Sequence, residues 1–311
     1  MDKYKLLLQD SCIEIKVHAP LKQQFDKNEI FKILPGNDFI VAGDDEIDEK
    51  VIRESALKGL KGIIKWGIGV DNIDLNAAMD CKIPVFNTPG VFGDEVAEQA
   101  LSLILNLSRG TNIIDSKVRN GVWYKFEGNS LQNKHLGIIG FGSIGKAIAH
   151  RAKSFGMKIN FYDPFLKKTI FDQNNISNVE FDEICKESDF IVMACSLNEK
   201  NKHIINEKSI SKMERKPYII NVSRGPLINE IDLIKALENG QIKGAGLDVY
   251  ENEPLPVNSK LVKMSNCVLG SHNSSNTIEA VERVNETIID MVIKLKKNNI
   301  SAELFRERRV V

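Results

Sequence analysis

Short apolar runs alternate along the chain with stretches whose apolar residues recur at helical spacing. The runs predict strands, and several are continuously apolar, which is typical of strands covered on both faces. They are YKLLLQ, DFIVAG and IPVFN in the first hundred residues, then LGIIG, INFYD, DFIVMAC, YIINV, GAGLDV and CVLG. Strands separated by helical stretches predict parallel sheets of the α/β class.

Two helical stretches are long and amphipathic. The first is predicted over 94–108, with acidic residues in its first turn and Arg109-Gly110 at its end. The second is predicted over 276–297, with apolar residues from Ile278 onward on one side. Packing against a sheet explains both patterns, so neither helix indicates a function by itself.

Length and composition limit the class of protein. A chain of 311 residues suggests two domains, and an apolar content of 42% excludes a disordered or collagen-like chain. Lys+Arg and Asp+Glu both total 42, so the overall basic field typical of nucleic-acid binding is absent. No apolar run approaches the ~20 residues that span a bilayer, and the charges that flank the leucines near the N-terminus lead us to expect no secretory signal. We therefore expect a cytoplasmic protein that binds neither nucleic acid nor membrane.

The cysteines give no sign of a metal or a disulfide framework. They are odd in number and show no CxxC spacing, so we expect reduced thiols and no metal site. The five are Cys12, Cys81, Cys185, Cys195 and Cys267.

The most specific motif is GFGSIG, which gives G-x-G-x-x-G at Gly140, Gly142 and Gly145. In a dinucleotide site the first glycine permits a tight turn, the second lets the backbone approach a pyrophosphate, and the third lets the helix pack on the strand. The helix that follows would present its first N–H groups, at Ser143 and Ile144, to the phosphates.

An acidic residue follows at the expected distance. Asp163 ends the next predicted strand, 18 residues after Gly145 and close to the ~20 typical of these sites. Its carboxylate can accept hydrogen bonds from both ribose hydroxyls and would repel a 2′-phosphate. A lone glycine motif is weak evidence, because ordinary turns contain it. The strand, helix, second strand and acid together predict an NAD site.

An arginine, two acids and a histidine follow three other predicted strands. Arg224 follows YIINV, Asp248 and Glu253 follow GAGLDV, and His272 follows CVLG. Ligands of open α/β sheets bind beyond the carboxyl ends of the strands, so these side chains should converge. Arg224 would bind and polarise a 2-keto acid, and His272 would exchange the proton, with Glu253 as its negative partner. The alternative is a surface ion-pair network.

With these motifs the chain resembles the D-2-hydroxyacid dehydrogenases, which combine G-x-G-x-x-G, an R-G after a strand, D-V-x-x-x-E-P and a later histidine. The matching stretches are GFGSIG, VSRGPLINE, LDVYENEP and GSHNSSNT, with GIGVDNIDL and NTPG…EVAE upstream. The resemblance covers nearly the whole chain. It implies an NAD-dependent enzyme with Arg224, Glu253 and His272 as the catalytic set and Asp248 near the nicotinamide.

The resemblance also implies the architecture. We expect two Rossmann-like domains, each a doubly wound parallel sheet, in a homodimer. The substrate domain would be discontinuous, over 1–99 and 281–311, and the NAD-binding domain would cover 100–280. Backbone groups of Gly69 and Val70 would contact the substrate carboxylate.

The substrate is less well defined by the sequence. The chain resembles short-form D-3-phosphoglycerate dehydrogenases most, so 3-phosphoglycerate and 3-phosphohydroxypyruvate are the expected pair. A phosphate needs a cation, and Lys65 is the nearest one to the Gly69 loop, with a side chain in solvent as the alternative. VAGDDE carries acids where phosphoglycerate enzymes tend to have an arginine. Asn273-Ser274-Ser275 replaces residues that are more often Gly or Ala.

The departures put the phosphorylated substrate in doubt, and two alternatives stay open. One is reduction of glyoxylate, hydroxypyruvate or another 2-keto acid. The other belongs to a different class, an NAD-sensing regulatory protein of the corepressor type, which would have no need for the catalytic set.

Overall fold

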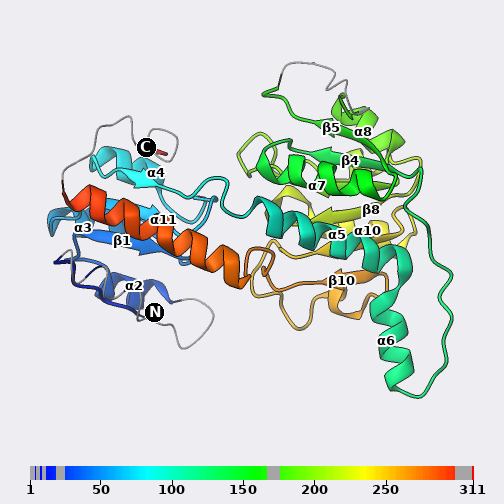
Figure 1. Ribbon diagram of the computed structural model, residues 1–311, viewed down its shortest axis with the longest axis horizontal. Helices are drawn as coiled ribbons and strands as arrows, with labels where there is room; N and C mark the ends of the chain where they lie inside the picture. Colours follow the sequence, from blue (N-terminus) through cyan, green and yellow to red (C-terminus); the bar gives the residue numbers. More distant parts are fainter. Residues whose placement is uncertain (1–3, 5–7, 9–11, 19–24, 167–175, 298–309) are drawn as a thin grey trace. The chain divides into compact units, whose positions relative to one another are not determined.

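The computed structural model describes residues 4, 8, 12–18, 25–166, 176–297 and 310–311 (Figure 1). The chain forms two compact units. One comprises Met1–Phe92 and Thr277–Val311, and the other comprises Gly93–Asn276. The first unit is thus built from both ends of the chain. The domain bounds expected from the sequence, 1–99 with 281–311 and 100–280, stay a prediction for the functional domains.

The first unit contains a parallel sheet in the order β1-β2-β3 within its described residues. Three of its helices begin after an aspartate whose carboxylate caps the first turn: Asp26, Asp48 and Asp74. The elements are α2 (Lys27–Ile33), β1 (Phe39–Ala42), α3 (Glu49–Leu57), β2 (Gly62–Lys65), α4 (Leu75–Asp80), β3 (Val85–Phe86) and α11 (Ile278–Lys296).

The sequence predictions for this unit are confirmed in part. β1 and β3 lie in the predicted strands DFIVAG and IPVFN, and α11 lies in the helix predicted over 276–297. β2 was not among the predicted strands, although all four of its residues are buried. Of YKLLLQ, only Tyr4 and Leu8 are described, and both are helical, so the strand prediction is wrong at these two positions. Its other residues lie outside the described ones.

Among its described residues, the second unit contains a seven-stranded parallel sheet in the order β10-β9-β8-β7-β4-β5-β6. Its elements are α5 (Gly93–Arg109), α6 (Thr111–Arg119), β4 (His135–Ile139), α7 (Ser143–Ser154), β5 (Lys158–Tyr162), β6 (Ile176–Asn178), α8 (Phe181–Glu187), β7 (Phe190–Met193), α9 (Glu207–Ile210), β8 (Tyr218–Asn221), η1 (Gly225–Leu227), α10 (Glu230–Glu238), β9 (Gly244–Leu247), η2 (Lys260–Lys263) and β10 (Cys267–Leu269). All strands predicted in this region are confirmed, as is the helix over 94–108. The short strand β6 was not predicted.

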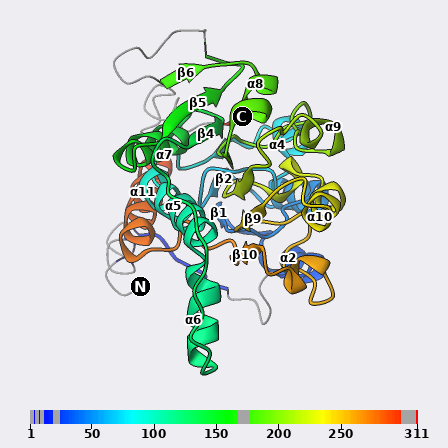
Figure 2. The same ribbon diagram turned by 90° about the vertical axis from the view of Figure 1, so that its right-hand side faces the viewer.

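Helices cover both faces of this sheet (Figure 2). On one face, a Cβ at Gly246 would lie 2.9 Å from the Cβ of Leu103 in α5, and α5 also packs on α7. On the other face, Ile191 and Ile219 share a hydrophobic core with Ile184 of α8 and with residues of α9 and α10. Burial on both faces explains the continuously apolar strands.

The strand order indicates at which edge of the sheet a ligand would bind. Within this sheet the first strand in the sequence is β4, with β5 and β6 added on one side of it and β7 to β10 on the other. This is the doubly wound arrangement that the sequence predicted. In such sheets the crevice beyond the carboxyl ends of the two central strands binds the ligand.

Candidate functional site

The glycine motif forms a tight turn between β4 and α7. Gly140 has a φ of 94°, and a Cβ there would lie 2.6 Å from backbone atoms of Cys195. A Cβ at Gly145 would lie 2.2 Å from the carbonyl oxygen of Gly140, so only glycine lets the helix pack this closely. At Gly142 nothing lies within 4 Å of a Cβ. The backbone is therefore accessible at the glycine that the sequence assigns to pyrophosphate contact.

The N-terminus of α7 adds backbone N–H groups to the glycine turn. Its N-cap residue is Gly142, so no side chain caps the helix there. The first backbone donor of the helix is Lys146, whose N–H bonds the Gly142 carbonyl at 3.0 Å. The N–H groups of Ser143 and Ile144 precede it and have no partner within the helix. This geometry fits a bound pyrophosphate.

Asp163 lies beside this turn, at the end of β5. Its Oδ2 accepts the N–H of Phe141 at 2.9 Å, and its Oδ1 accepts the N–H of Phe165 at 3.0 Å. The side chain of Asn178 fixes the same segment, because its Nδ2 donates to the carbonyls of Asp163 and Leu166 at 3.3 and 3.1 Å. Each carboxylate oxygen has two lone pairs, so Asp163 fits two ribose hydroxyls as well.

Arg224 is carried by a rigid loop after β8. Asn221 is 1% exposed, donates to the Arg224 carbonyl at 2.9 Å and accepts the N–H of Ser223 at 3.1 Å. The hydroxyl of Ser223 donates to the carbonyl of Cys195. A Cβ at Gly225 would lie 1.8 Å from the carbonyl carbon of Tyr250, so the loop also packs directly on the segment after β9.

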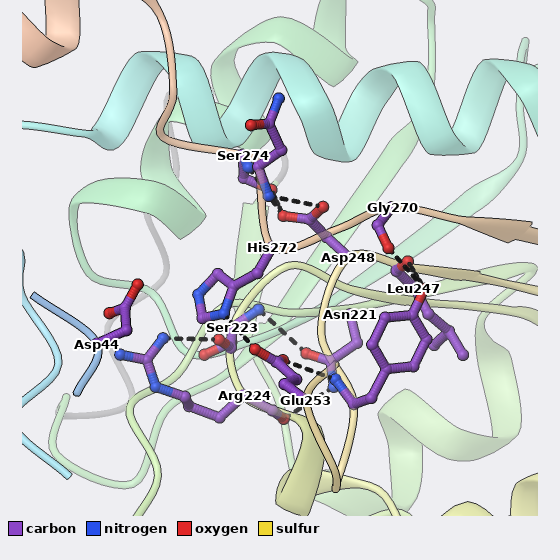
Figure 3. Close-up of polar contacts among 12 residues, drawn as sticks. Asp44, Asn221, Ser223, Arg224, Leu247, Asp248, Glu253, Gly270, His272 and Ser274 are labelled. Carbon is purple, nitrogen blue, oxygen red and sulfur yellow. Dashed lines mark hydrogen bonds and ion pairs between the residues drawn. The ribbon is translucent and has the colours of Figure 1, made fainter. Parts of the chain in front are cut away.

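Glu253 and His272 form a pair. The Nδ1 atom of His272 lies 2.7 Å from Oε2 of Glu253, and both side chains are about three-quarters buried, with 29% and 24% exposed (Figure 3). The other oxygen, Oε1, accepts the N–H of Tyr250 at 2.9 Å. Tyr250 is itself fixed, since the single proton of its hydroxyl is shared between the carbonyl oxygens of Leu247 and Gly270, at 3.1 and 2.8 Å.

Asp248 lies at the end of β9 and is completely buried. Its Oδ1 accepts the N–H of Asn273 at 3.1 Å, and its Oδ2 accepts the N–H of Ser274 at 2.8 Å and the hydroxyl of Ser274. The carboxylate therefore points into the loop after β10 (Figure 3). The expected position near a nicotinamide stays a prediction.

Lys65 ends β2 in the first unit and is not in solvent, the alternative weighed from the sequence. Its side chain is 2% exposed, and Nζ lies 2.9 Å from Oδ1 of Asp44. Nζ also donates to the carbonyl of Gly43. The ammonium is thus paired inside its own unit, which disfavours a substrate phosphate as its partner.

Gly69 and Val70 lie in a loop of the same unit. Thr88 and Asn87 hold the loop, through hydrogen bonds to Gly67 and from Asn87 Nδ2 to the Ile68 carbonyl at 2.8 Å. Among the hydrogen bonds between described residues, none is donated by the N–H of Gly69 or Val70. Contact of these groups with a carboxylate stays a prediction.

The structure also assigns positions that the sequence analysis missed. Asn221, Tyr250 and Ser274 position the predicted residues, and the sequence analysis gave none of the three a role. Tyr250 and Ser274 lie inside the matching stretches LDVYENEP and GSHNSSNT, whereas Asn221 lies in the predicted strand YIINV. A second histidine–carboxylate pair joins Nε2 of His203 to Glu251 at 2.6 Å. Burial is the main cause that raises the pKa of the nearby Glu230.

Burial keeps two other groups neutral. It is the largest cause that raises the pKa of Cys195 to about 11, and it raises the pKa of Tyr250. The thiol of Cys195 and the phenol of Tyr250 therefore stay protonated near pH 7. Within the part of the chain that the structure describes, no cluster of metal-binding side chains occurs, and no helix has the length and apolarity to cross a bilayer.

Comparison with known proteins agrees with this arrangement. Residues 101–274 match the family model described as the D-isomer specific 2-hydroxyacid dehydrogenase, NAD binding domain. The chain belongs to the D-isomer specific 2-hydroxyacid dehydrogenase family. As a member it is an enzyme that acts on a CH–OH group with NAD as cofactor, so the alternative of a purely regulatory protein is disfavoured.

Relatives in this family are named after different substrates. The glyoxylate reductase of Thermococcus litoralis is 40% identical, covering 84% of this chain and 80% of the relative. The hydroxypyruvate reductase of Thermotoga maritima is 38% identical, covering 88% and 89%. The D-3-phosphoglycerate dehydrogenase of Methanocaldococcus jannaschii is 34% identical, covering 87% of this chain but only 52% of the relative.

A solved structure extends the similarity to the fold of both units. The D-lactate dehydrogenase of Aquifex aeolicus, complexed with NAD and lactic acid, matches with a TM-score of 0.87 and 26% identity. The match covers 100% of this chain and 96% of that one.

Proposed function

We propose that this dehydrogenase reduces a small, unphosphorylated 2-keto acid, such as glyoxylate or hydroxypyruvate, to the D-2-hydroxy acid with NADH. The observation that carries this choice is the ion pair between the buried ammonium of Lys65 and the exposed carboxylate of Asp44. Because Lys65 is already paired with Asp44, the cation that the sequence analysis proposed as the partner of a substrate phosphate is engaged. The names of the relatives from Thermococcus litoralis and Thermotoga maritima support the same substrate class.

A phosphorylated substrate is the second candidate. The relative from Methanocaldococcus jannaschii favours 3-phosphoglycerate, which was the leading expectation from the sequence. A phosphate group brings a charge of about −1.5 to −2, which needs a cationic partner. The residues that follow β1, Asp44 to Glu46, are acidic instead, and repulsion from them would oppose a phosphate.

The proton step is assigned to His272. When bound, NADH supplies the hydride to the carbonyl carbon of the substrate. Nδ1 of His272 is engaged by Glu253, so Nε2 is the ring atom that passes a proton to the forming alkoxide. Glu253 stabilises the protonated ring and holds its orientation, and the N–H of Tyr250 fixes that carboxylate in turn.

Arg224 is assigned to the substrate itself. Its planar guanidinium suits two oxygens of a 2-keto acid and would polarise the carbonyl by charge-assisted hydrogen bonds. Backbone groups of Gly69 and Val70 are proposed as further contacts for the carboxylate. A cytoplasmic location and a homodimer are also retained as proposals.

The test is a set of initial rates of NADH oxidation with glyoxylate, hydroxypyruvate and 3-phosphohydroxypyruvate. We expect kcat/KM for a substrate without phosphate to exceed that for the phosphorylated one by at least about tenfold, the factor that 1.4 kcal/mol supplies. The reverse order would establish the phosphorylated substrate. Absence of turnover with every 2-keto acid would contradict the proposed reaction.

A further inference from the structure

The loop that carries His272 is held by hydrogen bonds to the buried carboxylate of Asp248. Asp248 is fully buried and accepts three hydrogen bonds from the two residues that follow His272: two from backbone N–H groups and one from the hydroxyl of Ser274. Ser274 is itself only 8% exposed. A buried carboxylate with three donors is an ordered arrangement, because loss of any donor leaves acceptor capacity that bulk water does not reach.

A further hydrogen bond to Asp248 fixes the backbone of His272 itself. The N–H of His272 donates to the carbonyl oxygen of Asp248 at 2.7 Å, so Asp248 holds the loop with both its backbone and its side chain. His272 has a φ of 55°, in the left-handed region that residues other than glycine seldom occupy. A conformation of this kind persists only where its surroundings fix it. Here the fixed backbone aims Nδ1 at Glu253.

Ser274 is the unusual part of this arrangement, since the family more often has a small Gly or Ala there. Gly or Ala would supply the backbone N–H but not the hydroxyl. We propose that Ser274 is a positioning residue whose hydroxyl, bonded to Asp248, holds the 272–274 loop so that His272 stays aligned with Glu253. The proposal rests on the proposed role of His272 in proton transfer.

A positioning role for the Ser274 hydroxyl and a simple packing role predict different effects when the hydroxyl is removed. The charged groups of the second unit drawn around His272 are Glu253, Asp248 and Arg224 (Figure 3), and Tyr250 adds a phenol whose pKa is raised by burial. If the loop loosens, the imidazole moves relative to Glu253 and loses part of the stabilisation of its protonated form. Packing alone would affect the melting temperature and leave the imidazole titration unchanged.

The test compares Ser274→Ala with two other variants at this position. Ser274→Thr retains a hydroxyl and should keep the wild-type titration midpoint of His272 and the wild-type kcat. Ser274→Cys retains the size and replaces the hydroxyl with a weak donor, so it reports on the bond even if the alanine variant does not fold. The control is Ser275→Ala, because Ser275 is the next residue and its hydroxyl is not one of the three donors to the Asp248 carboxylate.

The titration of the His272 imidazole is followed by NMR in the enzyme without substrate, and kcat and the NADH dissociation constant are measured alongside. We expect Ser274→Ala and Ser274→Cys to move the titration midpoint to lower pH and to lower kcat by roughly 10- to 100-fold, the cost of a misplaced reacting group. NADH binding should not change. Ser274→Thr and Ser275→Ala should match the wild type.

Two results would overturn the inference. One is a wild-type titration midpoint in both Ser274→Ala and Ser274→Cys, and the other is an equal shift in Ser275→Ala. If the wild-type enzyme turns over no 2-keto acid, the proposed function fails separately, and the NMR titration still decides whether Ser274 aligns His272.

Discussion

Glu253 and His272 are 19 positions apart in the sequence, and their side chains meet at 2.7 Å. They come from the ends of the neighbouring strands β9 and β10, which are parallel and in register from Cys267 to Leu269. The pair therefore exists only because both strands end at the same edge of the sheet. This relationship turns an isolated histidine into one with a fixed ring orientation and a negative partner.

The first prediction concerns the charge of that partner. Glu253→Gln keeps the size of the side chain but removes its negative charge. The limb of the pH–rate profile that reports His272 should move to lower pH, because the protonated imidazole loses its stabilising carboxylate. Steady-state rates from pH 5 to 9 check this, and an unmoved limb would show that the pair does not govern the proton step.

The second prediction separates the glycines of the dinucleotide turn. Gly142→Ala should change the free energy of unfolding by no more than about 1 kcal/mol, since the added Cβ meets open space. It should raise the NADH dissociation constant at least about tenfold by filling the surface that a pyrophosphate approaches. Fluorescence titration with NADH measures the binding.

Gly145→Ala is the matched comparison for that variant. Its Cβ would clash with the Gly140 carbonyl, so it should cost about 1–3 kcal/mol of stability or more. Equal effects of the two substitutions on stability, with NADH affinity retained in Gly142→Ala, would contradict this division of roles.

The third prediction concerns cofactor choice. Asp163 should give a preference for NADH over NADPH of at least about tenfold in kcat/KM, through repulsion of the 2′-phosphate. Asp163→Ala should narrow this ratio by weakening NADH and relieving the repulsion. Dissociation constants for both cofactors provide a reading independent of turnover. Equal use of the two cofactors by the native enzyme would exclude the assigned role.

The fourth prediction is a pH dependence of stability. The pKa of His135 is lowered by burial and by the neighbouring Arg215 and Lys158. The folded state therefore takes up a proton at lower pH than the unfolded state, whose histidine titrates near 6.5. Stability should fall as pH drops below about 6.5, because the unfolded state then binds more protons.

The check is urea unfolding at pH 7.5 and 5.5 for the wild type and His135→Gln. The variant should lose less stability between these pH values than the wild type. An identical loss in both proteins would show that other groups cause the dependence.

Much of the second unit could be predicted from the sequence. Its buried strands are continuously apolar, and each motif occupies the turn that follows one of them, so parallel order alone brings Arg224, Glu253 and His272 to one edge. β2 was missed because only Ile63 and Ile64 of its four residues form an apolar run, between Gly62 and the charged Lys65, and β6 because only one of its three residues is buried.

The sequence could not show how side chains pair. Lys65 was expected either to hold a phosphate or to point to solvent, and nothing in its neighbours indicates that it would pair with Asp44, 21 positions earlier. Ser274 was noted only as a departure from the family pattern. Its bond to Asp248 depends on the close packing of two loops, which a linear motif does not encode.

The most direct test of the central claim is the turnover of His272→Ala. If His272 is the proton donor, kcat at saturating substrate should fall by about 10²–10⁴-fold, the usual effect of removing a general acid. The NADH dissociation constant should stay within about twofold of the wild type, because the dinucleotide turn is unchanged. An unchanged kcat would contradict the assignment of His272 and, with it, the catalytic role of Glu253.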